Sequence, residues 1–243
     1  CLLTGLTAQE VQPLCSRAAA ETGVAFTLEE EGADLRISAQ GKGAHASLPE
    51  DGNNGITALL HLLSSLPLAP CESTEALRAL HTLFPHGDSA GNALGIAQAD
   101  QLSGPLTVCF SLLELNGTGL SGQFDCRASL CANEDNCKAV TEAAFAKFGF
   151  TAEGGMEPGH HTPAGSPFIQ TLLHCYEQYT GQKGECLAIG GGTYVHHIPG
   201  GVAFGCDFPG FDPKMHSADE QASVENLLKS AKIFALAIAE LCK

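Results

Sequence analysis

Apolar and polar positions in the first part of the chain follow helical and strand periods in turn. Thr7 and Glu10 have the spacing of a capping box, and apolar residues at helical spacing continue from there to Gly23. The runs 24–29 and 35–41 flank a glycine turn, which is the pattern of a β-hairpin. The same periodicity predicts two further helices, near 55–66 and over 73–83.

A second hairpin is indicated farther along the chain. The runs 106–115 and 120–130 flank Asn116-Gly-Thr-Gly119, a strong turn signal, and a helix is expected over 134–148. Residues 84–105 show little periodicity and are expected to be irregular. Helices that alternate with paired strands predict an α+β domain over residues 1–155, with helices on one face of an antiparallel sheet.

The remainder, residues 156–243, has a different pattern. Ser166-Pro167 caps an expected helix that ends at Gly181, and two short apolar runs, 185–189 and 201–206, are typical of buried strands. Ser217 and Glu220 have capping-box spacing and predict a last helix over 218–242. A segment this short cannot cover both faces of two buried strands, so we expect it to be one part of a larger α/β domain.

Composition and net charge argue against several classes of binding partner. The 243 residues carry a formal charge of −15, from 12 Lys and Arg against 27 Asp and Glu, and no basic stripe is present. A nucleic-acid partner or an anionic membrane is therefore not expected. No run has the length of a membrane span, and the eleven cysteines have no zinc-site spacing, so most of them are expected to be reduced thiols of a cytoplasmic protein.

Several residues could carry chemistry, but each also has an ordinary interpretation. Gly191 and Gly192 belong to a triple glycine that could leave N–H groups open to a ligand oxygen or simply form a tight turn. His45 lies among turn-forming residues, and Arg127 is on the polar side of the second hairpin. His216, just before the expected cap, fits a surface histidine as well as a ligand.

Two motifs together resemble a known family. Residues 41–53, GKGAHASLPEDGN, are similar to the lid-domain motif of the dinuclear zinc aminopeptidases, carboxypeptidases and deacylases. The stretches IGGGTYVHHIPGGVAFG and PKMHSADE resemble the end of the same family's catalytic domain. The greatest similarity is to the bacterial dipeptidase V branch, which cleaves carnosine-like Xaa-His and other short peptides. The resemblance implies a lid domain followed by the C-terminal part of an α/β zinc-peptidase domain, and a cytoplasmic metallopeptidase.

The resemblance also implies roles. His216 corresponds to a metal ligand, for which a neutral imidazole suits zinc, and two zinc ions are expected in a complete active site. His45 corresponds to a lid histidine that stabilises the oxyanion. Arg127 corresponds to a lid arginine that binds the substrate carboxylate, and Gly191, Gly192 and Thr193 to the lining of the substrate pocket.

Some of the family's pattern is missing from this sequence. The family's other metal ligands and its general-base glutamate lie in an N-terminal segment, and the acidic run 29–31 is expected to be a solvated surface instead. His196 stands where the dipeptidases usually carry an arginine. Since a catalytic zinc commonly needs three protein ligands, we expect a fragment that is inactive alone and acts on short peptides only with its missing partner segment. The alternative is a non-catalytic module for small-molecule binding or for assembly, such as a homodimer through the lid.

Overall fold

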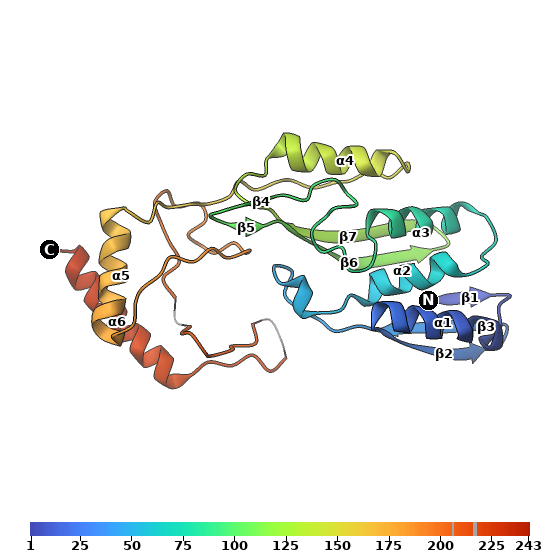
Figure 1. Cartoon of the computed structure of the whole chain (residues 1–243), viewed down its shortest axis with the longest axis horizontal. Coiled ribbons are helices and arrows are strands. Elements are labelled where there is room, and N and C mark those ends of the chain that lie inside the picture. The colour runs from blue at the N-terminus through green and yellow to red at the C-terminus, as the bar shows by residue number, and fades with distance from the viewer. Residues whose placement is uncertain (206, 216–217) are drawn as a thin grey trace. The chain divides into compact units, whose positions relative to one another are not determined.

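The chain is mixed α/β, with small antiparallel sheets and packed helices. The computed structural model describes residues 1–205, 207–215 and 218–243. These divide into two compact units, Cys1–Pro158 (unit 1) and Gly159–Lys243 (unit 2), each described by itself. The sequence placed the boundary three residues earlier, after residue 155. The helices and strands of unit 1 are labelled in Figure 1.

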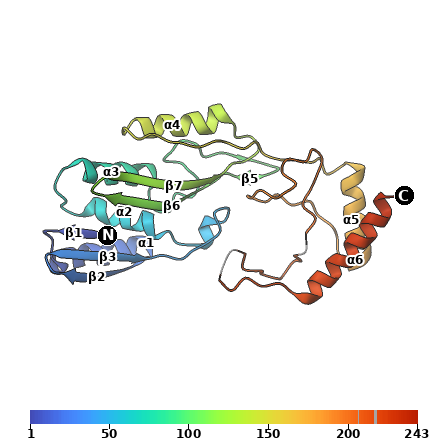
Figure 2. The same cartoon turned by 180° about the vertical axis from the view of Figure 1, so that it is seen from behind.

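The first sheet of unit 1 has three antiparallel strands in the order β1-β3-β2 (Figure 2). The capping box at Thr7 and Glu10 starts the first helix, and Gly23 ends it in the left-handed conformation. Leu35 and Ile37 of the central strand point into the core against this helix. The elements are β1 (Leu2–Thr4), α1 (Ala8–Thr22), β2 (Ala25–Glu31) and β3 (Asp34–Gln40).

Helix α2 lies between two parts of the core, because it carries apolar residues on more than one side. Leu62 and Leu63 pack with the first sheet, and Leu60 packs with the aromatic cluster of the second hairpin. A helix that is apolar on more than one side is typical of a buried position. The two helices here are α2 (Gly55–Ser65) and α3 (Glu72–Leu83).

The second hairpin carries an aromatic cluster on one face. Phe110 and Phe124 are directly opposite each other across the two strands, and Phe84 and Phe145 pack on them. Phe84 follows α3 and Phe145 lies in α4, so the cluster joins both helices to the hairpin. Residues 84–105, expected to be irregular, contain one two-residue strand pair. The elements are β4 (Ala99–Asp100), β5 (Gly104–Pro105), β6 (Thr107–Asn116), β7 (Gly119–Arg127), a π-helical turn η2 (Glu134–Lys138) and α4 (Ala139–Ala146).

Unit 2 has two described helices, α5 (Pro167–Thr180) and α6 (Val224–Leu241), which pack on each other. Ser166 caps α5 and Gly181 ends it in the left-handed conformation, as the sequence predicted. The buried residues between the helices are few: Leu172, Cys175, Ile233 and Ala237.

The two strands expected in unit 2 are not formed. Residues 185–189 and 201–205 have no regular secondary structure, and residue 206 lies outside the described residues. Leu187 is 83% exposed and Ile189 is 65% exposed. An apolar run becomes a strand only when a neighbouring strand takes up its backbone hydrogen bonds. Within the described part of unit 2, no strand provides that partner.

The last helix begins six residues later than the sequence indicated. Ser223 is its N-cap and accepts the Asn226 N–H at 3.2 Å, whereas the predicted cap, Ser217, lies outside the described residues. Residues just before the helix are held elsewhere: Gln221 donates its N–H to Pro213 O at 3.0 Å, and Asp219 pairs with Lys214. These contacts favour a loop over an earlier helical turn.

Candidate functional site

The loop that carries His45 is closed at its base. Lys42 and Asn53 exchange two backbone hydrogen bonds of 2.8 Å. A side chain at Gly41 would place its Cβ 2.5 Å from Asn53 O, and one at Gly52 would place it 2.7 Å from Lys42 O. Only glycine permits this close approach of the two backbones. The short 3-10 turn η1 (Pro49–Asp51) lies within the loop sequence, between His45 and Asn53.

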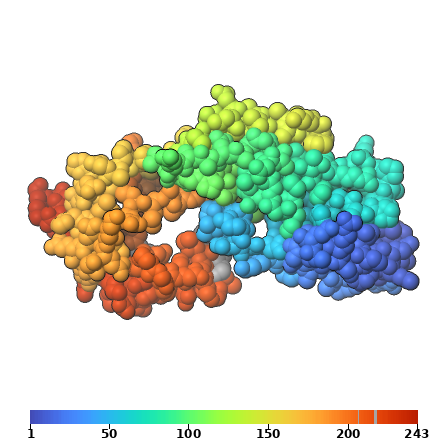
Figure 3. Space-filling model, viewed as in Figure 1, coloured from blue at the N-terminus to red at the C-terminus, as the bar shows by residue number. Residues whose placement is uncertain are grey.

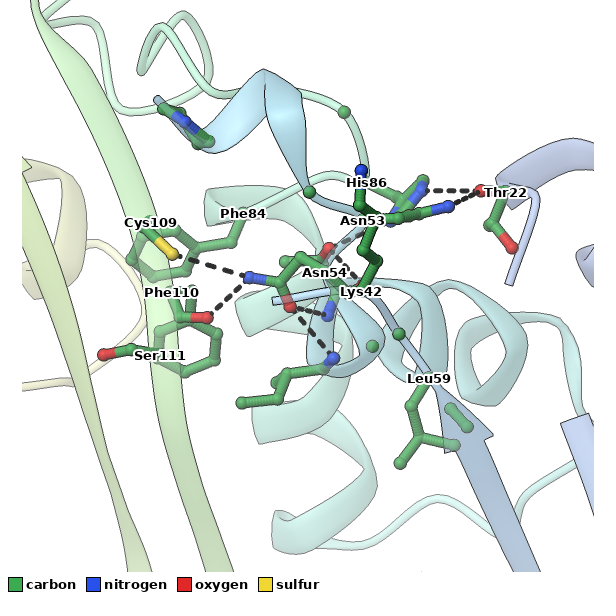
Figure 4. Close-up of a pocket in the computed structure, with 18 of the residues that line it drawn as sticks. Thr22, Lys42, Asn53, Asn54, Leu59, Phe84, His86, Cys109, Phe110 and Ser111 are labelled. Atoms are coloured by element: carbon green, nitrogen blue, oxygen red, sulfur yellow. Dashed lines mark hydrogen bonds between the residues drawn. The ribbon is translucent and has the colours of Figure 1, made fainter. Parts of the chain in front are cut away.

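Two asparagines tie the base of the loop to the rest of unit 1. Asn53 donates its side-chain N–H to Thr22 O at 2.9 Å, at the end of α1. Asn54 caps α2 through its side-chain oxygen and donates its side-chain N–H to Phe110 O at 2.7 Å (Figure 4). One residue therefore joins the start of a helix to β6, so the loop is fixed between elements that are themselves packed.

The hydrogen bonds of His45 determine its tautomer. The Ser47 N–H lies 3.3 Å from His45 Nδ1, and Ser47 Oγ lies 2.7 Å from the same nitrogen. Because an amide N–H can only donate, Nδ1 must be an acceptor. In the neutral ring the proton is then on Nε2, which makes that nitrogen a hydrogen-bond donor.

Arg127 is held by a neighbouring carboxylate at the end of β7. Its Nε and one terminal nitrogen donate to the two oxygens of Asp125, at 2.6 and 3.0 Å. Both side chains are about one-third exposed. Such a two-pronged contact fixes the plane of the guanidinium and shows that it can hold a carboxylate here.

The structure brings the His45 loop and Arg127 to the same strand pair. Thr107 of β6 is the direct cross-strand partner of Arg127. The Thr107 hydroxyl donates to Ala46 O at 3.0 Å, one residue beyond His45. The two residues that the resemblance assigned to oxyanion and carboxylate are thus linked through a single threonine within unit 1.

A cleft of about 930 Å³ opens beside the base of this loop. Its wall includes Lys42, Asn53 and His86 (Figure 4), and neither His45 nor Arg127 is among the described residues that line it. His86 contacts Thr57 Oγ1 at 2.9 Å and Thr22 O at 3.2 Å. Burial lowers the pKa of His86, which favours a neutral ring.

The glycine segment of unit 2 has an irregular conformation. Gly191 and Gly192 have no heavy atom within 4 Å of an added Cβ, and neither has a positive φ. Thr193 O accepts the His196 N–H at 3.0 Å, which forms a turn just after the glycines. The His196 ring lies beside those of His160 and His197, with centroids 5.9 and 5.1 Å away. Nothing in this local geometry requires glycine.

The predicted metal ligand His216 lies outside the described residues. In the part of the chain that the structure describes, no three His, Cys, Asp or Glu side chains gather as they would around one metal ion. The described residues by themselves therefore do not fit a two-zinc centre, which needs several protein ligands for each ion.

Sequence reasoning missed three residues that position the predicted ones. Ser47 determines the tautomer of His45, Asp125 orients Arg127, and Asn54 anchors the loop. The signal for Asn54 was present, because an asparagine directly before a helical apolar pattern is a favoured N-cap. Ser47 lies two residues after His45, and Asp125 lies two residues before Arg127. Neither spacing is a sequence signal comparable to an N-cap.

No helix of the described residues combines the length and apolar character needed to cross a lipid bilayer. The described cysteines are free thiols.

Comparison with known proteins places the chain near the dipeptidases, although no family model matches it. It is 34% identical over 229 residues to the Beta-Ala-Xaa dipeptidase of Lactobacillus delbrueckii subsp. lactis, covering 90% of this chain and 46% of that protein. It is 31% identical over 214 residues to "Putative dipeptidase YtjP" of Bacillus subtilis (strain 168), covering 88% and 45%. The chain spans a little under half the length of these curated relatives. Both relatives are named as dipeptidases, and this chain is similar to one part of each.

Proposed function

We propose that the chain contributes a lid domain and the last part of the catalytic domain to a metal-dependent dipeptidase. Xaa-His and related short peptides are the expected substrates. The name of one relative, Beta-Ala-Xaa dipeptidase, is compatible with this, because β-Ala-His belongs to both classes. Two zinc ions are the expected cofactor, with His216 as one ligand. Since the described residues lack a three-ligand group and the chain spans under half of its relatives, the other ligands would come from elsewhere in the whole protein.

The observation that carries the proposal is the loop-held imidazole of His45. Its Nδ1 accepts the Ser47 N–H, so its Nε2 is the donor. A fixed donor suits the negative charge that develops on the carbonyl oxygen when a peptide bond is attacked. The double backbone link between Lys42 and Asn53 holds the loop before substrate arrives, so little reorganisation would be needed during the reaction.

Arg127 would bind the free carboxylate of the peptide. Asp125 holds its guanidinium in one plane, and both groups stay partly accessible. A substrate carboxylate could approach donor positions that Asp125 does not use, because guanidinium has five N–H groups. Gly191, Gly192 and Thr193 would line the pocket for the rest of the substrate.

The test uses the full-length product of the encoding gene with a dipeptide substrate such as β-Ala-His. We expect His45→Ala to lower kcat by about two to three orders of magnitude, the scale for loss of one oxyanion donor. The matched control is His174→Gln, which removes an exposed histidine of α5 and should leave kcat unchanged. The isolated 243-residue chain should not hydrolyse the peptide.

Two results would count against this proposal. An unchanged kcat in His45→Ala would remove the assigned role of the loop. Metal-dependent hydrolysis by the isolated chain would show that its own residues form a complete centre.

A further inference from the structure

Two histidines join helices α2 and α3 on unit 1. His61 of α2 and His81 of α3 face each other, with His61 Nδ1 and His81 Nε2 3.3 Å apart. The ring centroids are 5.5 Å apart and the planes are inclined by 49°, so the rings meet at their edges and are not stacked. Neither residue is among the site residues predicted from the sequence.

A carboxylate from a third helix orients one of the rings. Glu21, at the end of α1, lies 2.7 Å from His61 Nε2. Because a carboxylate only accepts, the proton of neutral His61 is on Nε2, and the lone pair of Nδ1 is directed toward His81. The hydrogen bond from Arg17, and next that from His61, lowers the pKa of Glu21, so this carboxylate is charged at neutral pH.

The separation of the two nitrogens has the value expected for two ligands of one metal ion. Imidazole nitrogens bind zinc at about 2.0–2.1 Å, so two of them at a tetrahedral angle are about 3.3–3.4 Å apart. Without a metal, the proton of neutral His81 would be on Nε2 and shared with His61. A metal ion could take its place when that proton moves to His81 Nδ1, so the total proton count does not change.

We propose that His61 and His81 form a solvent-facing, two-histidine site for a divalent transition-metal ion of the zinc, nickel and copper class. Imidazole nitrogen suits these ions and suits magnesium or calcium poorly. Glu21 is the carboxylate that fixes the ligand tautomer, an arrangement common behind metal-bound histidines. Water completes the coordination, since the described residues near the pair offer no third protein ligand.

The surroundings allow a hydrated ion to reach the pair. The His61 side chain is 32% exposed and that of Glu21 is 41% exposed. In the space-filling view, the dark-blue atoms of α1 lie beside the cyan and teal atoms of the α2–α3 region on the surface of unit 1 (Figure 3). A bound ion would connect α2 to α3 directly and stabilise the fold by an amount that grows with the logarithm of the free metal concentration.

Calorimetric titration of the purified protein with Ni²⁺ tests the site, because nickel favours imidazole over thiol ligands more than zinc does. We expect one binding isotherm that is absent from both His61→Gln and His81→Asn. Glu21→Gln should keep it with about tenfold to hundredfold weaker affinity, the usual effect of removing a partner of a ligand histidine. His174→Gln, which removes an exposed histidine on another helix, is the matched control and should titrate like the wild type.

Thermal unfolding provides a second measurement. Excess Ni²⁺ should raise the Tm of the wild type and of His174→Gln, and should leave the Tm of His81→Asn unchanged. Circular dichroism checks that each variant is folded. If His81→Asn or His61→Gln is not folded, the nickel affinity of Glu21→Gln tests the proposed site instead. Equal nickel affinity in the wild type and in every folded variant would overturn the proposal.

Discussion

Two runs that the sequence predicts as strands, one in unit 1 and one in unit 2, have opposite environments. Leu35, in the run 35–41, is fully buried in the central strand of a sheet. Leu187, in the run 185–189, is 83% exposed and belongs to no strand. Both runs are short and bounded by turn residues, but 35–41 alternates apolar with polar residues whereas 186–189 is continuously apolar. What differs is the partner: β3 is paired on both sides, and the described residues of unit 2 offer the other run no strand to pair with.

The difference shows which sequence signals are sufficient by themselves to predict a helix or a strand. A helix makes its hydrogen bonds internally, so a cap and a periodic face indicate that it forms in both units, even where its first residue is not determined locally. A strand makes its hydrogen bonds with another segment, so its sequence describes only half of the structure. A hairpin is the exception, because the turn places the partner next to it.

Replacing Leu35 or Leu187 with alanine should give the largest difference in the free energy of unfolding. Leu35→Ala should lower the free energy of unfolding by about 2–5 kcal/mol, because it removes a buried side chain and leaves a cavity. Leu187→Ala should change it by no more than about 0.5 kcal/mol, as for an exposed position. Urea denaturation followed by circular dichroism measures both. A similar cost for the two variants would show that 185–189 is buried, as the sequence predicted.

Two glycines give a smaller contrast of the same kind. Gly52→Ala forces a Cβ to within 2.7 Å of Lys42 O, and overpacking of this kind costs about 1–3 kcal/mol. Gly191→Ala meets open space at a non-positive φ, so its stability should stay within about 0.5 kcal/mol of the wild type. The same denaturation experiment compares them. A destabilised Gly191→Ala would mean that the glycine segment of unit 2 packs closely after all.

The smallest expected effect is a pH dependence located in unit 1. Hydrogen bonds, first that from the Ser103 hydroxyl and next that from its N–H, lower the pKa of Asp100 to about 2 from its ordinary 3.8. The folded chain therefore binds fewer protons than the unfolded chain between these values, so this contribution to stability is present above about pH 4 and is lost as the pH falls toward 2.

Asp100→Asn should flatten the pH dependence of unfolding in that window. The comparison in unit 2 is Glu225→Gln, which removes an exposed carboxylate whose pKa is lowered by the Lys229 hydrogen bond. The urea midpoint of each protein is plotted against pH from 2 to 5. The slope of this plot should differ from that of the wild type more for Asp100→Asn than for Glu225→Gln. An equal slope for the wild type and Asp100→Asn would contradict the assignment.

Most of unit 1 could be predicted because its signals are local. The capping box at Thr7 and the turn at Asn116–Gly119 determine elements whose partners are close in sequence. The start of α6 could not, because Ser217 and Ser223 both have capping chemistry and the choice depends on loop contacts of Gln221. The π-helical turn of η2 also has no distinguishing pattern in the sequence.

The candidate site likewise contains features that the sequence could predict and features that it could not. The motif around His45 identified the loop, and glycine at positions 41 and 52 is explained by backbone contacts within it. The threonine link from Ala46 to the partner of Arg127 joins residues about 60 positions apart, so periodicity could not have found it. The pairing of His61 with His81 depends likewise on how α2 packs against α3.

The closed loop presents His45 as a hydrogen-bond donor through Nε2. NMR of the ¹⁵N-histidine-labelled chain measures this directly, because the two ring nitrogens of a neutral imidazole differ in ¹⁵N shift and in their couplings to the ring protons. With the ring neutral, we expect the His45 proton on Nε2 and an unprotonated Nδ1 that accepts from Ser47. A proton on Nδ1 would contradict the account.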